Sequence, residues 1–503
     1  MIVGNSVKSK RNKWLDVLLF IARDNPMLTP FQVVVTGALS QGWIPNSVTR
    51  ARLQRSLDLD DMYKSPATVL AVSSKIRPKL KNLKRLEFLE SEIFLDLSTS
   101  SKQNVITGIQ RIVNSINPEN GTMKKTAISK SGMMILDDQF TMPKLAQQLN
   151  LIGSGVWHRW VSNLLIGIRS EKIQQLLVKI IASIRELLAF GYVDKEKRVI
   201  FVPFNCTWNL MEVASDVHQI DFLEFLLDAD MIKMKVLFHD LIPLTHPELC
   251  PPDPRGNFLR YLKLTSRAFE VICISNDVKR RYDAYLSMLD NLEHNQSVRV
   301  LPYPVSPLIK KKGILSKPVN DFLNLNRPYL IATGGFTRRK NLGIVIGALA
   351  LKPISLDLVI VGNNQWGADY ISDELKIWHS VANQVHLFPN VTDVDLNVLL
   401  ENALALVYPS LAEGFGLPIL EGISYGLPVL TSDLEPMRSI TNDPICINPH
   451  HLEDWSRSIL ELSISRQTDI NLQYLYRHED YEANHRYMWS TWIQQFFCFE
   501  EEN

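Results

Sequence analysis

Residues 408–428 read YPSLAEGFGLPILEGISYGLP, and this stretch decides the fold class. The apolar run 405–408 has the length of a buried strand and leads into a glycine-rich loop. Pro418 fits the first turn of a helix, because its missing N–H would have no partner there, and Gly426 fits the position after that helix. A second strand expected at 429–431 completes a strand–loop–helix–strand unit of a parallel sheet.

The glycine-rich loop leads into the helix, whose first N–H groups and positive dipole end suit an anion such as a diphosphate. Glu413 and Glu421 flank this loop, and two carboxylates would repel an anion that bound there alone. They fit a ligand that also carries sugar hydroxyls, because a hydroxyl donates hydrogen bonds to a carboxylate. The pattern predicts a site for a ligand with both phosphates and sugars; the alternative is a surface loop with two solvated acids.

The segment EGFGLPILE has the Glu-x7-Glu spacing and resembles the retaining glycosyltransferases of family 4, which have the GT-B fold. The resemblance implies an α/β protein in which two Rossmann-like, doubly wound parallel-sheet domains face a central cleft. It implies that Glu413 contacts hydroxyls of the donor sugar and that Glu421 binds the ribose of the nucleotide. The N–H groups of Phe415, Gly416 and Leu417 would then lie beside the donor diphosphate.

A second motif, TGGFTRRKN, occupies residues 333–341. Glycines after a strand, Gly335 among them, let the backbone approach a ligand, and three consecutive cations suit a diphosphate. The motif resembles the Arg-Lys-Asn segment of the same family, which implies that Arg339 and Lys340 bind the leaving diphosphate. Arg338 stands where many relatives have proline, so the resemblance assigns it no role.

The N-terminal half supplies further candidates at the ends of expected strands. The segment FHDLIPLTHPE resembles the family segment whose histidine reaches the donor sugar, and we carry that role to His239 alone, with Asp240 as a candidate to orient its ring. The resemblance implies that Gly108 lies in a cleft loop close to the donor phosphates and the acceptor; the alternative is a glycine that merely allows a turn. Asn205 and Trp208 are expected in a cleft loop.

Strands expected at 329–333, 356–362, 385–387, 405–408 and 429–431 alternate with helices expected at 341–351, 369–382, 393–402 and 417–425, as in a doubly wound sheet. The sequence predicts five regions: a basic, mainly helical N-terminal extension (1–90), an N-terminal Rossmann-like acceptor domain (91–306), a linker (307–326), a C-terminal Rossmann-like nucleotide-sugar donor domain (327–479) and a C-terminal helix that crosses back to the N-terminal domain (480–503).

The net charge of +1 over 503 residues argues against a general nucleic-acid binder. Residues 1–90 are basic, and within them the run 76–89 is either a membrane-facing segment or the solvated face of a helix. A helix expected at 171–190 either packs in the core or faces an acceptor or membrane.

Five cysteines without metal-ligand spacing favour a reduced compartment. No apolar run reaches the roughly 18 residues of a transmembrane span, so we expect a cytoplasmic protein that is either soluble or in peripheral contact with the inner face of the membrane through the basic segment.

We therefore expect a retaining, metal-independent glycosyltransferase that moves a hexose, as mannosyltransferases do, from a nucleotide diphosphosugar to a saccharide or lipid-linked saccharide acceptor. Its setting would be the synthesis of a cell-surface polysaccharide. No metal site is expected, because Arg339, Lys340 and the N–H groups of the glycine-rich loop would stabilise the diphosphate without one, and no cofactor is expected beyond the donor substrate. The alternative is a catalytically inactive nucleotide-sugar-binding partner or regulatory protein. An epimerase of the same fold has no supporting residues.

Overall fold

The computed structural model describes residues 85–99, 123–129, 132–135, 199–250, 255–289, 296–304, 313–352, 354–362, 368–389, 391–440, 445–467 and 489–497, with Ile21, Gln32, Thr36 and Ala38 in addition. Its contacts form two compact units, Met1–Val236 with Arg260–Phe269 and Leu237–Leu259 with Glu270–Asn503. Gly108 and the helix expected at 171–190 lie outside the described residues. Of the helices that are described, none is both long enough and apolar enough to cross a bilayer.

A seven-stranded sheet has the order β4-β3-β2-β6-β7-β8-β9. Its strands are β2 (Ile93–Asp96), β3 (Met123–Ser129), β4 (Gly132–Ile135), β6 (Cys206–Leu210), β7 (Ile232–Phe238), β8 (Glu270–Cys273) and β9 (Ser297–Val300). Strand β2 pairs in parallel with both β3 and β6, whereas β3 and β4 form an antiparallel pair that the sequence patterns did not indicate. Apolar runs such as VLF in β7 are buried, as expected of strands covered on both faces.

Two sequence interpretations are wrong in this half of the chain. The last residues of the run 76–89 form no helix, because they belong to strand β1 (Arg85–Glu90), which pairs in parallel with β5 (Val199–Phe204). Trp208 is not in a loop but inside β6, where it is completely buried and its ring centroid lies 5.3 Å from that of Phe94. In both places the tertiary pairing of strands overrides the local pattern.

A six-stranded parallel sheet has the order β12-β11-β10-β13-β14-β15. Its strands are β10 (Tyr329–Thr333), β11 (Asp357–Gly362), β12 (Val385–Pro389), β13 (Ala405–Tyr408), β14 (Val429–Ser432) and β15 (Ile445–Ile447). The five strands expected from sequence are confirmed to within two residues, and β15 is an additional edge strand. The order reverses between β10 and β13, and ligands of open α/β sheets bind at the carboxyl ends of strands beside such a switch point.

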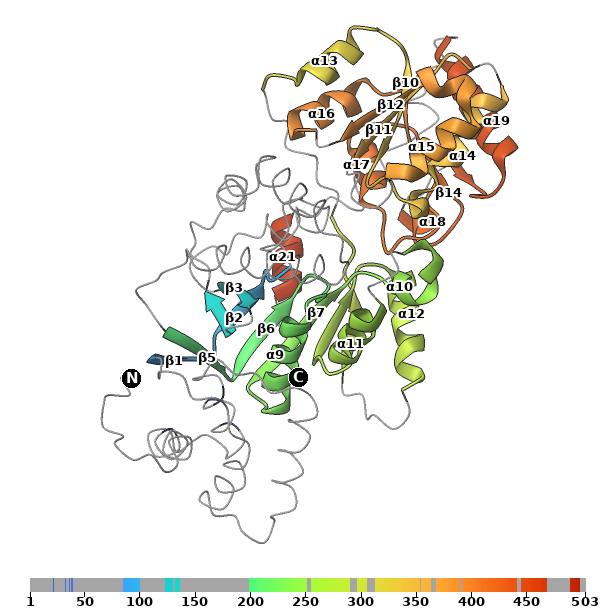
Figure 1. Ribbon diagram of the computed structural model, residues 1–503. Coiled ribbons are helices and arrows are strands. Elements are labelled where there is room, and N and C mark those ends of the chain that lie inside the picture. Colours follow the sequence, from blue (N-terminus) through green and yellow to red (C-terminus); the bar gives the residue numbers. More distant parts are fainter. Residues whose placement is uncertain are drawn as a thin grey trace, which may run out of the picture. The chain divides into compact units, whose positions relative to one another are not determined.

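Helices cover both faces of this sheet: α14 (Leu342–Leu351), α15 (Ala368–Ile377), α16 (Asp393–Asn402), α17 (Leu417–Ser424), α18 (Met437–Ile440) and α19 (Leu452–Gln467). Figure 1 shows α14, α15 and α19 together beside the strands. Right-handed crossovers place α14 and α15 on one face and α17 on the other, because their strands progress in opposite directions. The core between α14, α19 and the strands contains Val345, Ile346 and Trp455, each fully buried. A further helix, α13 (Lys317–Leu323), precedes β10 in the stretch expected to be a linker.

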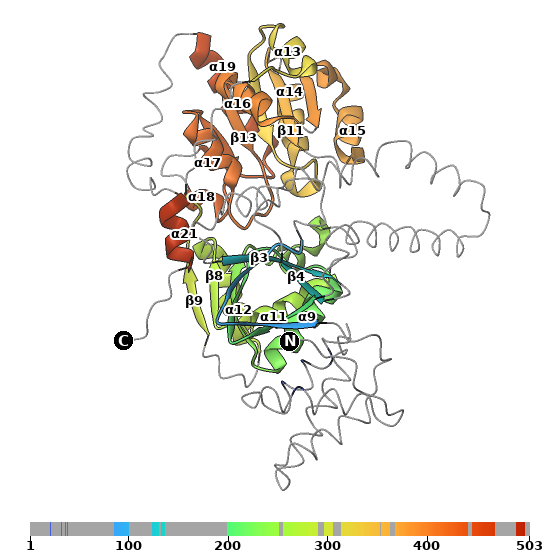
Figure 2. The ribbon, with the colours of Figure 1, turned by 90° about the vertical axis from the view of Figure 1, so that its left-hand side faces the viewer.

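The remaining helices are α9 (Val217–Asp228), α10 (Ile242–Thr245), α11 (Arg255–Thr265), α12 (Asn276–Ser287) and α21 (Trp489–Phe497). Ser275 caps α12 by accepting a hydrogen bond from the N–H of Val278, as its position in the sequence predicts. Helix α21 lies near β9 (Figure 2), and Arg299 of β9 donates a 2.8 Å hydrogen bond to the carbonyl oxygen of Gln495. The C-terminal segment is thereby anchored inside the second compact unit.

Candidate active site

The two motifs singled out in the sequence meet at the carboxyl ends of β10 and β13, which are neighbours in the sheet. Strand β10 ends at Thr333, and Gly334 follows with φ = 127°, a conformation that favours glycine. A 3-10 turn (Arg338–Lys340) then leads into α14. Strand β13 ends at Tyr408, and its loop leads through Gly416, also at positive φ, into α17.

Glu413 lies between the two cations that the sequence assigns to the diphosphate. Its Oε2 is 2.5 Å from Nη1 of Arg339, and its Oε1 is 2.7 Å from Nζ of Lys340. The side chain of Glu413 is only 10% exposed, and that of Lys340 only 11%. Arg339 is also tied to the loop through a 2.8 Å hydrogen bond to the carbonyl oxygen of Ala412. The structure therefore brings three predicted site residues into one compact charged cluster.

The charges of this cluster shift one another's pKa values. Burial by itself would raise the pKa of the Glu413 carboxyl, but Arg339 and Lys340 outweigh it and lower that pKa to about 2. The pKa of Arg339 rises, because attraction to Glu413 exceeds the cost of burial. Burial dominates at Lys340 and lowers its pKa despite the neighbouring carboxylate. Glu413 is thus a permanent anion at neutral pH, bound by two cations.

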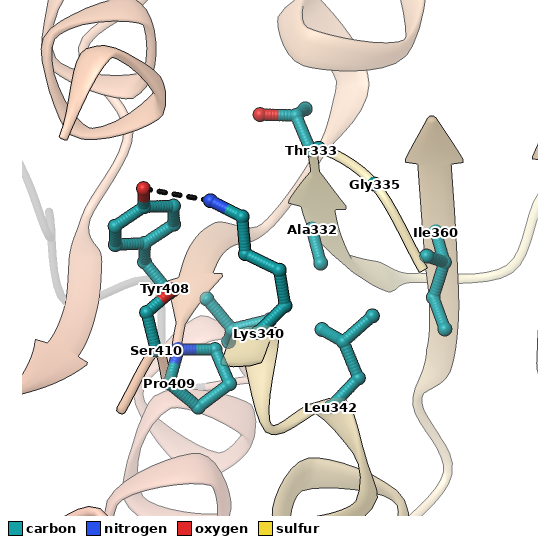
Figure 3. Close-up of a pocket in the computed structure, with 11 residues that line it drawn as sticks. Ala332, Thr333, Gly335, Lys340, Leu342, Ile360, Tyr408, Pro409 and Ser410 are labelled. Atoms are coloured by element: carbon teal, nitrogen blue, oxygen red, sulfur yellow. Dashed lines mark hydrogen bonds between the residues drawn. The ribbon is translucent and has the colours of Figure 1, made fainter. Parts of the chain in front are cut away.

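A small pocket opens beside this cluster (Figure 3). It is lined by residues of the β10 and β13 ends and of the strand and helix next to them: Ala332, Thr333, Gly334, Gly335, Lys340, Leu342, Ile360, Val407, Tyr408, Pro409 and Ser410. The hydroxyl of Thr333 is buried there without a hydrogen-bond partner in the described part of the chain. A buried polar atom of this kind is commonly satisfied by a ligand or a water molecule.

Glu421 lies on α17, half-buried, one helical turn inside the end that carries the loop. Its charge acts on Lys340, so the second glutamate belongs to the same electrostatic environment as the first. Gly416 occupies the N-cap position, so the N–H of Leu417 has no preceding helical carbonyl to bind. Pro418 has no N–H, and the N–H of Ile419 donates to the carbonyl oxygen of Gly416 at 2.9 Å. Phe415 is buried, with its ring edge-on to that of Tyr303 at 5.4 Å.

His239 follows the last residue of β7 and is 2% exposed. Its Nδ1 lies 3.1 Å from the hydroxyl of Tyr303, so Tyr303 is an orienting partner of the ring that the sequence did not indicate. Asp240, the expected partner, instead accepts a hydrogen bond from the N–H of Ile242, and burial raises its pKa. The carbonyl of His239 faces Gly414 within the same compact unit: a Cβ at Gly414 would meet that oxygen at 2.0 Å.

The other predicted residues are placed as follows. Gly335 is half-buried and lines the pocket. Arg338, which the resemblance left without a role, is exposed and points over the ring of Tyr370 at 5.6 Å, away from Glu413's two partners. Asn205 forms an exposed turn at φ = 51° between β5 and β6. Gly108 lies outside the described residues, so its two interpretations stand.

Sequence patterns missed Asp96, at the end of β2. It is fully buried and accepts hydrogen bonds from Trp208 Nε1 and Gln219 Nε2, both at 3.0 Å, and from the N–H and hydroxyl of Ser98. Burial outweighs these bonds and raises its pKa. The one available signal was its position, an aspartate closing an apolar strand. Among the described residues, no group of three His, Cys, Asp or Glu side chains could hold a metal ion.

Two α/β sheets, the first parallel apart from the β3–β4 pair and the second wholly parallel, place the structure in the GT-B class of fold. The structure is similar to that of Anabaena Alr3699/HepE in complex with UDP, with a TM-score of 0.50 and 15% identity over 80% of this chain and 98% of that one. Residues 317–474 match the family model of the "Glycosyl transferases group 1".

Two curated relatives have related descriptions. The chain is 24% identical over 259 residues to the O-antigen chain mannosyltransferase B of Escherichia coli. The aligned region covers 47% of this chain and 63% of that protein. It is 28% identical over 157 residues to the O-antigen chain mannosyltransferase RfbU of Salmonella typhimurium. The aligned region covers 30% of this chain and 44% of that protein. The matches thus span less than two thirds of these relatives' length.

Proposed function

We propose that this protein is a retaining, metal-independent glycosyltransferase that moves a sugar from a nucleotide diphosphosugar to an acceptor hydroxyl. One observation carries the proposal: Glu413 is held by both Arg339 and Lys340, beside the N-terminus of α17. Such a cluster combines cations for a diphosphate with a carboxylate for sugar hydroxyls. The family model that residues 317–474 match supports the same reaction class.

The reaction that follows is balanced without a cofactor. The bond between the anomeric carbon and the diphosphate oxygen breaks, the acceptor oxygen bonds to that carbon, and the acceptor's proton passes to the departing diphosphate. Negative charge grows on the diphosphate as its bond breaks, and Arg339, Lys340 and the N–H groups of Phe415, Gly416 and Leu417 would stabilise it. Because the acceptor attacks on the face that the diphosphate leaves, the anomeric configuration is retained.

The remaining roles are those that the family resemblance implies. Glu413 would accept hydrogen bonds from hydroxyls of the donor sugar, and Glu421 from the ribose. His239 would contact the donor sugar, with its ring held by Tyr303. The N–H groups of Phe415, Gly416 and Leu417, together with Gly335, would border the diphosphate. Two fixed cations can neutralise the leaving group, so the proposal requires no metal.

The substrates are proposed from the relatives. Two of them are named O-antigen chain mannosyltransferases, and a third is named a D-rhamnosyltransferase of Pseudomonas aeruginosa. We therefore place the protein in the synthesis of a cell-surface polysaccharide, with a hexosyl donor of the mannose type and a saccharide or lipid-linked saccharide acceptor. The acceptor would be reached from the cytoplasmic side, with the basic segment 1–90 touching the inner membrane face, and residues 91–306 would form the acceptor domain.

The experiment is a panel of nucleotide sugars offered with saccharide and lipid-linked acceptors, with release of nucleoside diphosphate as the readout. Lys340→Ala should lower kcat about 100-fold or more, as the loss of one transition-state charge partner does. Lys352→Ala removes an exposed lysine at the other end of α14 and should leave the rate unchanged.

Glu421→Ala should weaken nucleotide binding about tenfold or more, because a charge-assisted hydrogen bond is lost. Glu401→Ala, an exposed glutamate at the end of α16, is its matched control. Tight nucleotide-sugar binding without release from any donor would instead identify an inactive binding partner.

A further inference from the structure

Lys340 is held by two partners, and only one of them is a charge. Its Nζ donates to Oε1 of Glu413 at 2.7 Å and to the hydroxyl of Tyr408 at 2.9 Å. The same Nζ lies 4.4 Å from the centroid of the Tyr408 ring, which is cation–π distance. Figure 3 shows the Lys340 side chain reaching across the pocket to this hydroxyl.

Tyr408 is a rigid partner because the sheet fixes its backbone. It is the last residue of β13, it pairs with Thr431 of β14, and it is 3% exposed. Thr431 also donates its hydroxyl hydrogen to the carbonyl oxygen of Tyr408. A ring with so little freedom gives the lysine a fixed acceptor, whereas a lysine side chain alone has four flexible torsions.

An ammonium group has three hydrogens. The hydrogen bonds of the described residues use two of them, on Glu413 and Tyr408. The group itself lines the pocket, close to Gly334, where an added Cβ would lie 3.4 Å from Nζ. The direction of the third N–H of Lys340 is therefore fixed by the hydrogen bonds to Glu413 and Tyr408.

We propose that Tyr408 is a positioning residue, which holds the ammonium group of Lys340 so that its remaining N–H faces the diphosphate of the donor. The diphosphate in this role rests on the proposed function, whereas the contact between Lys340 and Tyr408 does not. The hydroxyl of Tyr408 stays neutral, because burial raises its pKa well above the usual range. It therefore competes with the diphosphate far less than a second carboxylate would.

The direct test measures the titration of Lys340 by competitive labelling with acetic anhydride over a range of pH, followed by peptide mass spectrometry. Tyr408→Phe keeps the ring but removes the hydroxyl that stabilises the charged amine. The apparent pKa of Lys340 should then fall by about one unit, because a hydrogen bond to a charged group is lost. At a pH below both pKa values, the labelling rate should rise about tenfold.

Tyr329→Phe is the matched control. Tyr329 is also a buried tyrosine at a strand of this sheet, and its hydroxyl donates to the carbonyl oxygen of Leu399 at 2.7 Å rather than to a charged group. The Tyr329→Phe change should leave the titration of Lys340 unchanged. An identical Lys340 titration in Tyr408→Phe and in the wild type would overturn the positioning role, whatever the activity of either protein.

Kinetics then separate this role from the proposed function. In an active enzyme, Tyr408→Phe should lower kcat roughly tenfold and change KM for the donor less than threefold, because the loss falls on charge that develops in the transition state. A shifted titration with unchanged kcat would also overturn the role. A wild-type protein that releases no nucleoside diphosphate refutes the proposed function, yet the labelling result would still report the contact.

Discussion

Oε1 of Glu413 lies 2.7 Å from Nζ of Lys340, and this pair joins two sequence motifs that are more than seventy residues apart. The loop after β13 and the turn after β10 are thereby locked to each other before any substrate arrives. A preorganised cluster of this kind stabilises developing charge without a further cost of reorganisation when the reaction occurs.

The pH dependence of stability tests the Glu413 cluster. The pKa of the Glu413 carboxyl is about 2 in the folded protein, below the ordinary glutamate value of 4.5. The folded value is the lower one, so its stabilisation is complete above pH 4.5 and is lost as the pH falls toward 2. The shift corresponds to roughly 3 kcal/mol. We expect the free energy of unfolding of the wild type to fall more steeply over this window than that of Glu413→Gln. Parallel curves would show that the pairing contributes nothing.

Gly414→Ala tests the close approach of the Glu413 loop to His239. A Cβ there would lie 2.0 Å from the carbonyl oxygen of His239, so the backbone must move. The Ser275 hydroxyl, which donates to the Gly414 carbonyl at 2.9 Å, would be displaced as well. We expect the free energy of unfolding to drop by about 1–3 kcal/mol and nucleotide binding to weaken. Gly256→Ala in α11 meets no atom within 4 Å and should have little effect; equal effects of the two changes would contradict the geometry.

Asp96→Asn tests the buried network behind β2. An amide at this position would aim two N–H groups at neighbours that already donate, so at least two hydrogen bonds of Asp96 would be lost. The expected cost is about 2–4 kcal/mol of unfolding free energy, measured by chemical denaturation, because the Nε1 of Trp208 is among the groups that donate to Asp96. Asp228→Asn alters a partly exposed ion pair with Arg267 and should cost less than about 1 kcal/mol. A cost at Asp96 no greater than that at Asp228 would refute the network's importance.

Thiol reactivity tests burial in the second unit. Burial raises the pKa of Cys273 to about 12, so its thiolate is scarce at pH 8. Cys250 is half-exposed. We expect an aromatic disulfide reagent to modify Cys250 at least tenfold faster than Cys273 in the native protein, as mapped by peptide mass spectrometry. Comparable rates under native conditions would show that β8 is not packed as described.

The sequence predicts most of the C-terminal sheet because strands such as β10 and β13 are continuous apolar runs between recognisable turns, whereas the three-residue edge strand β15 was not predicted. Residues 329–333 and 405–408 coincide with β10 and β13. Strand β1 was missed because its RLEFLE pattern is short and charged, and it exists through pairing with β5, which lies over a hundred residues away. Local patterns carry no information about such a partner.

Some residues of the candidate site could likewise be predicted from the sequence, and others could not. Motif spacing indicates Glu413, Arg339 and Lys340, and the structure brings these three together. The sequence assigned no role to Tyr303 or to Tyr408, although Tyr408 opens the stretch 408–428, because only the fold places their hydroxyls beside His239 and Lys340. Charged motifs are visible in sequence, whereas the neutral groups that position them are not.

The central claim is most directly tested by nucleoside diphosphate release from a panel of nucleotide sugars, with acceptor present, by the wild type and by Lys340→Ala. We predict release from at least one hexosyl donor, dependent on acceptor, and a loss of about 100-fold or more in the variant. Binding of a nucleotide sugar without release from any donor, or equal rates for the two proteins, would contradict it.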